Sequence, residues 1–146
     1  MKLFRFMSLD EFQKYCNGEV LTNNTNHNKD RNKKTASVGF CFFNYADFNP
    51  EEILHSVTGI VDISMCAIFE TNRENVIKSW GRYSKPDTES PYKREIFIAK
   101  EYCTTKYSKD KFKLLKYAIP DWFSYKWEWK EGANIGKQKN FKRMGR

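Results

Sequence analysis

The sequence predicts a single α+β domain, with a mixed or antiparallel split sheet, a few short helices and a central cleft. Three observations indicate this class: two segments carry helix-capping signals, strand-like apolar segments gather in the second half, and no internal repeat is present. A chain of 146 residues with 40% hydrophobic and 16% aromatic residues can bury one core. We expect this domain to span residues 1–130 and a basic tail to follow over 131–146.

The chain begins with a predicted strand that contains a charge. Within the segment LFRFM, strand alternation places Leu3, Arg5 and Met7 on one face and Phe4 and Phe6 on the other. An arginine on an apolar face needs an anion, either a carboxylate or a phosphate. We predict that Arg5 points into the cleft and meets a phosphate.

The next segment, SLDEFQKYCNG at 8–18, predicts a helix. Ser8 as N-cap and Glu11 three residues later form a capping box, and Gly18 provides the stop. Glu11 is also a carboxylate with which Arg5 could form a structural ion pair, which is the alternative to a phosphate contact.

The middle of the chain combines a polar segment with two regular elements. Residues 22–37 are polar and aperiodic, which predicts a long mobile loop that shields the edge of a cleft. The run VGFCFF at 38–43 predicts a buried strand. The segment 48–57 predicts a helix, with Asn49 as cap and Pro50 at the first position.

Four further elements are expected in the second half. Apolar runs predict strands over 59–70, 94–102 and 111–120. The segment NRENVIKSW, residues 72–80, predicts a short helix that ends near Gly81.

The cysteine spacing and the hydropathy bear on metal binding, on the redox state of the thiols and on membrane association. Cys16, Cys41, Cys66 and Cys103 are widely separated and form no CxxC pair, so we expect reduced, mostly buried thiols and no metal site. No apolar run approaches the roughly 20 residues of a membrane span, and the start lacks a signal peptide's apolar stretch. We therefore expect a cytoplasmic protein that does not bind membranes.

The net charge of +8 is concentrated near the end of the chain. Residues 126–146 hold seven Lys/Arg and two Asp/Glu, a net of +5. This charge indicates either a solvated surface or an acidic or nucleic-acid partner, and we expect the tail to set target association. The segment WFSYKWEWK, residues 122–130, either supplies anchors for binding a partner or folds its tryptophans back onto the core.

Catalytic motifs are scarce. His27 and His55 have no spaced metal-ligand partners, and nucleotide-binding and hydrolase motifs are absent from the sequence. Cleavage of the glycosidic bond of NAD needs little more than a carboxylate beside the ribose, a cation for the pyrophosphate and an aromatic wall. The chain offers Glu95, Arg5 and a phenylalanine-rich strand for these roles.

The order of these parts resembles ADP-ribosyltransferases of the Arg-Ser-Glu type. An arginine on a first strand is followed by a helix, by Ser-x-Gly-Phe-x-Phe-Phe at 37–43 and by a glutamate opening a late strand. The resemblance implies that Arg5 holds NAD, that Ser37 with Phe43 or Tyr45 supports the nicotinamide site, and that Glu95 is catalytic.

The small size and composition are similar to phage-encoded members, including ADP-ribosylating anti-CRISPR proteins. The resemblance implies an effector in the host cytoplasm that uses NAD as substrate to modify a host defence protein, such as a nucleic-acid-associated complex. Lys93 stands where arginine-modifying members carry an acid, which disfavours an arginine acceptor. Two alternatives stay open: a non-enzymatic small basic inhibitor that binds a host protein or nucleic-acid-binding surface, and a domain that binds a nucleotide without turnover.

Overall fold

The computed structural model describes residues 1–26, 38–57, 64–86, 89, 93–120 and 127–133. Its helices are α1 (Leu9–Cys16), α2 (Pro50–Val57) and the 3-10 turn η2 (Arg73–Asn75). Its strands are β1 (Lys2–Met7), β2 (Leu21–Thr22), β3 (Phe40–Asn44), β4 (Met65–Glu70), β5 (Ile77–Pro86), β6 (Arg94–Thr104), β7 (Lys106–Tyr107), β8 (Lys113–Ala118) and β9 (Trp129–Glu131). The predicted α+β class is confirmed.

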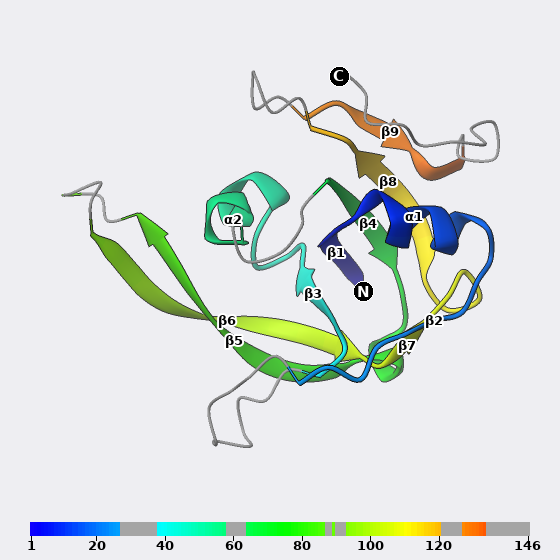
Figure 1. The fold of residues 1–146 in the computed structure, drawn as a ribbon, viewed down its shortest axis with the longest axis horizontal. Helices are drawn as coiled ribbons and strands as arrows, with labels where there is room; N and C mark the ends of the chain where they lie inside the picture. The colour runs from blue at the N-terminus through cyan, green and yellow to red at the C-terminus, as the bar shows by residue number, and fades with distance from the viewer. Residues whose placement is uncertain (27–37, 58–63, 87–88, 90–92, 121–126, 134–146) are drawn as a thin grey trace.

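A seven-stranded sheet in the order β5-β6-β3-β1-β4-β8-β9 forms the body of the protein, and β2 and β7 form a two-stranded sheet beside it. Every strand pairing in the described part of the chain is antiparallel. Strand β3 pairs with β6 only over Phe40–Phe42 opposite Tyr102–Thr104. Strands β5 and β6 pair over ten residues and continue as a long hairpin beyond β3 (Figure 1).

The two helices pack on opposite faces of this sheet. In β1, Leu3 and Met7 belong to the cluster that contains Phe12 of α1, whereas Phe4 belongs to the cluster that contains Ile53 of α2. The alternation predicted for β1 is therefore confirmed. We call the two sides the α1 face and the α2 face.

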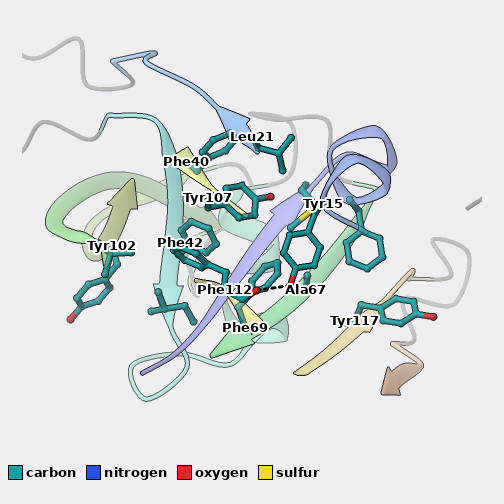
Figure 2. Packing of buried hydrophobic residues seen from close by; sticks show 14 of the residues in the cluster. Tyr15, Leu21, Phe40, Phe42, Ala67, Phe69, Tyr102, Tyr107, Phe112 and Tyr117 are labelled. Carbon is teal, nitrogen blue, oxygen red and sulfur yellow. Dashed lines mark hydrogen bonds between the residues drawn. The ribbon is translucent and has the colours of Figure 1, made fainter. Parts of the chain in front are cut away.

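Aromatic rings fill the α1 face. The rings of Phe42, Tyr107 and Phe112 lie with centroids 5.2 to 5.5 Å apart, in the stacked and edge-on arrangements that aromatic pairs prefer. Tyr15 of α1 reaches into the same cluster and donates a hydrogen bond of 2.5 Å to the Phe112 carbonyl (Figure 2). This bond satisfies a polar tip that would otherwise be buried alone.

The predicted helix over 72–80 is wrong. Only Arg73–Asn75 form a 3-10 turn, and β5 begins at Ile77. Pairing with β6 gives each residue from Ile77 to Pro86 a cross-strand partner, and this tertiary pairing outweighs the weak helical pattern of the segment.

Other predicted boundaries shift by smaller amounts. The strand predicted over 111–120 spans Lys113–Ala118. Of the strand predicted over 59–70, Met65–Glu70 form β4, and residues 59–63 lie outside the described part of the chain. Of the predicted mobile loop, residues 27–37 lie outside the described part of the chain, so its role as a lid stays a prediction.

From the sequence, the tryptophans of residues 122–130 could either anchor a partner or fold back onto the core, and the structure distinguishes the two for Trp127 and Trp129. Trp127 and Trp129 stack with centroids 5.6 Å apart and pack against the cluster on the α2 face. For these two residues the core-closing interpretation is confirmed. Trp122 and the basic tail from residue 134 onward lie outside the described residues. In the described part of the chain, no helix has the length and apolar character needed to cross a membrane.

Gly39 positions β3, and its substitution tests this role. Its φ is +84°, and a Cβ there would lie 2.4 Å from the Thr104 carbonyl oxygen and 2.8 Å from that of Asn23. Gly18 is the matched control, because its φ is +80° with nothing within 4 Å. We expect Gly39→Ala to lower the free energy of unfolding by about 3 kcal/mol and Gly18→Ala by about 1 kcal/mol, measured by urea denaturation. If both substitutions lowered the free energy of unfolding equally, the cost at Gly39 would come from its positive φ alone and not from contact of a Cβ with the two carbonyl oxygens.

Candidate functional site

Arg5 lies on the α1 face and is held by a carboxylate of the same chain. Its Nε and Nη2 donate to the two oxygens of Glu11 at 2.7 and 2.8 Å, and its Nη1 donates to the Cys41 carbonyl at 3.2 Å. The guanidinium also lies 5.1 Å from the ring centroid of Phe40, within cation–π range. The anion that Arg5 meets is therefore Glu11, which is the structural alternative considered from the sequence.

A tyrosine completes this network. Tyr107 Oη donates a hydrogen bond of 2.6 Å to Glu11 Oε2. Burial, together with the negative charge of Glu11, raises the pKa of Tyr107 far above its ordinary value, so the hydroxyl stays a donor. The network thus joins β1, α1, β3 and β7, and each nitrogen of the Arg5 guanidinium donates to a group inside the fold.

The predicted nicotinamide-site residues lie on or beside β3. Phe43 is buried on the α2 face and stacks on Phe4 at 5.4 Å. Tyr45 is 36% exposed, with the Lys2 ammonium 4.1 Å from its ring centroid. Ser37 lies outside the described residues.

Glu95 lies near the far end of the β5–β6 hairpin, opposite Lys85. It is seven residues from Tyr102, where β6 meets β3, and a strand of that length spans about 23 Å. Strand alternation also places Glu95 on the α2 face, whereas Arg5 is on the α1 face. The structure does not bring Arg5 and Glu95 together, and their roles in NAD chemistry stay predictions.

The hairpin instead presents an uncovered surface. Ile96 and Ile98 of β6 are 57% and 61% exposed on the α1 face, beyond the point where β3 ends its pairing. On the other side of the hairpin, Phe97 and Tyr83 pack against the α2-face cluster. We call the uncovered side the arm face and define it by Lys78, Trp80, Arg94, Ile96, Ile98 and Lys100.

Charge is unevenly divided between the two sides of this hairpin. Lys78, Arg94 and Lys100 are on the arm face, whereas both acidic residues of the two strands, Glu95 and Glu101, are on the opposite side. Lys78 Nζ lies 5.3 Å from the ring centroid of Trp80. Arg94 donates to the hydroxyl and the carbonyl of Ser84, at 2.8 Å each. The arm face is therefore a basic frame around exposed isoleucines.

The sequence contained a signal for this surface that the helix prediction obscured. In the run from Ile77 to Arg82, basic or aromatic residues alternate with small or apolar ones, which is typical of a half-exposed strand. The exposure of Ile96 and Ile98 could not be predicted, because an apolar run is equally typical of a buried strand.

Comparison of the chain with protein-family models, curated proteins and solved structures found no match. The function therefore has to be inferred from the geometry of the site.

The Arg5–Glu11 pair can be tested with a double-mutant cycle of Arg5→Ala and Glu11→Ala. Either single change leaves a largely buried charge without its partner, so we expect each to lower the free energy of unfolding by about 3 kcal/mol. The double variant should lose much less than the sum, with a coupling of about 2 kcal/mol.

The control cycle uses Lys14 and Asp10, an ion pair of 3.2 Å whose side chains are 48% and 77% exposed. Its coupling should stay below about 0.5 kcal/mol because solvent screens it. If Arg5→Ala did not lower the free energy of unfolding, the result would contradict a structural ion pair and favour a role for Arg5 in binding a ligand.

Proposed function

We propose that this protein is a non-enzymatic binding protein whose arm face docks on an acidic surface of a protein partner. One observation carries the proposal: two largely exposed isoleucines are surrounded by basic side chains on a hairpin face without an acidic residue among its described strand positions. Exposed apolar side chains in a polar frame are typical of protein interaction sites.

The energetics suit docking. Burying one isoleucine side chain contributes about 1.5 to 3 kcal/mol, so Ile96 and Ile98 form a small apolar anchor. Lys78 and Lys100 would add long-range attraction and orientation toward an acidic partner. The strands are paired over ten residues, so little conformational entropy is lost on binding.

A protein partner fits this face better than a nucleic acid. Binding of single-stranded nucleic acid depends on aromatic platforms for the bases, and exposed isoleucines offer none. Trp80 is only partly exposed and Lys78 lies over it. A fully basic groove would also suit phosphates, whereas the centre of this face is apolar.

The partner can be identified and then tested with purified components. A photo-crosslinking residue at position 98 should capture a protein that the same residue at position 77 does not, because Ile77 is on the opposite side of the hairpin. The captured protein is then purified, and its binary complex with the full chain is measured by calorimetry at two salt concentrations.

We expect Ile96→Asp and Ile98→Asp each to weaken this binary complex by about tenfold or more. Ile77→Asp is the matched control, since Ile77 is 75% exposed but is on the other side, and it should change the dissociation constant by less than about twofold. Lys100→Glu should slow association and reduce the salt dependence.

Three outcomes would contradict the proposal. In the first, Ile98→Asp binds the captured protein as the wild type does. In the second, the crosslinked species is a nucleic acid. In the third, the wild type transfers label from NAD to the captured protein and Glu95→Gln abolishes the transfer, which would establish the enzymatic alternative.

A further inference from the structure

The register between β3 and β6 brings two distant cysteines together on the α2 face. Cys41 and Cys103 are cross-strand partners, and their Sγ atoms lie 3.5 Å apart. Glu101, two residues earlier on the same side of β6, places its Oε2 3.9 Å from Cys103 Sγ. One ligand atom from each of the three residues lies within 4.8 Å of the other two.

Glu101 is an unusual residue for this position. Its side chain is only 2% exposed, yet no Lys, Arg or His among the described residues pairs with it. A buried carboxylate costs several kcal/mol unless it is paired with a cation or coordinates a metal. Its neighbours, two thiols and a hydroxyl, do not supply positive charge when neutral.

We propose that Cys41 Sγ, Cys103 Sγ and Glu101 Oε2 bind a zinc ion, with a fourth coordination position open to water. Zinc–sulfur bonds of about 2.3 Å and zinc–oxygen bonds of about 2.1 Å at tetrahedral angles need sulfur–sulfur and sulfur–oxygen separations of about 3.8 and 3.6 Å. The separations of 3.5 and 3.9 Å are close to both values. Since all the ligand atoms lie within 4.8 Å of one another, side-chain rotations that bring the Cys41 sulfur and the Glu101 carboxylate to about 3.6 Å would complete the site.

Neighbouring residues hold the carboxylate in place. The Tyr83 hydroxyl donates a hydrogen bond to Oε1 of Glu101, which leaves Oε2 directed toward the cysteines. Such outer-shell hydrogen bonds orient the ligands in metal sites. Burial, together with the charge of Glu101, raises the pKa of Tyr83 above its ordinary range, so the donor proton is retained.

Gly81 makes room for this arrangement. A Cβ at that position would lie 1.8 Å from Glu101 Oε1, so only glycine lets the carboxylate lie in its observed position. Cys41 is partly exposed, which gives an ion a route from solvent to the ligands.

The ligand set selects the metal by chemistry. Two thiolates favour soft or borderline ions, and a carboxylate beside them favours zinc over copper(I). Binding is an exchange without electron transfer: each thiol loses its proton to solvent as its sulfur–zinc bond forms. Because each thiol must lose its proton to bind, zinc affinity should increase with pH.

The test uses the full chain, reduced and stripped of metal with a chelator. Titration with cobalt(II) should produce thiolate-to-cobalt charge-transfer absorption that saturates at one ion per chain, and zinc should displace the cobalt. We expect Cys41→Ser and Cys103→Ser each to lose this absorption, and Glu101→Gln to retain it with about tenfold to hundredfold weaker affinity. Cys16→Ser, at the end of α1, is the matched control and should bind as the wild type does.

A second measurement avoids reliance on variants that could unfold. Zinc added to the wild type should protect Cys41 and Cys103 from alkylation, as mapped by mass spectrometry. The proposal is overturned if the reduced wild type binds no cobalt or zinc, if Cys41→Ser and Cys103→Ser bind as the wild type does, or if the pair forms a disulfide in saturating zinc. None of these readouts depends on the protein partner of the arm face.

Discussion

The bidentate ion pair between Arg5 and Glu11 is the interaction on which the rest of the structure depends. It joins the central strand β1 to α1 across the α1 face, while Tyr107 and the Cys41 carbonyl extend it to β7 and β3. A buried charge on an apolar face is costly unless it is paired and hydrogen-bonded. Here each guanidinium nitrogen, both Glu11 oxygens and the Tyr107 hydroxyl take part in a hydrogen bond. The pair therefore specifies how the helix, the aromatic cluster and β3 fit together.

The position of β3 sets what the β5–β6 hairpin can do. Because β3 pairs with β6 only near the base of the hairpin, most of β6 continues without a neighbour on that side (Figure 1). On the α2 face of the hairpin Tyr83 and Phe97 pack against the core cluster, whereas Ile96 and Ile98 on the arm face are exposed. The exposed isoleucines lie on the part of β6 that extends past its pairing with β3, and the basic residues around them limit which partners fit.

The proposed zinc ligands lie at the same junction. Cys41 and Cys103 connect β3 to the base of the hairpin, so an ion between them would fix the origin of the arm without occupying its uncovered face. A binding surface gains from a rigid base because less conformational entropy is lost on docking. The metal site and the arm face would therefore have separate chemistry and a shared mechanical role.

The sequence by itself determined the elements whose signals are local. The N-cap at Ser8, the cap and proline of the second helix, and the alternation of Leu3, Arg5 and Met7 act within a few residues and form as predicted. The second half of the predicted capping box does not form, because the Glu11 carboxylate accepts from Arg5 and Tyr107 instead. The anion of Arg5, the strand over Ile77–Pro86 and the meeting of Cys41 with Cys103 were decided by the tertiary structure. Arg5 and Glu11 are only six residues apart, but local patterns left both a carboxylate and a phosphate open, and the packing of α1 on β1 selected the carboxylate. The strand and the cysteine pair depend on the register of β6 with β5 and β3, and Cys41 and Cys103 are 62 residues apart, which short-range patterns do not encode.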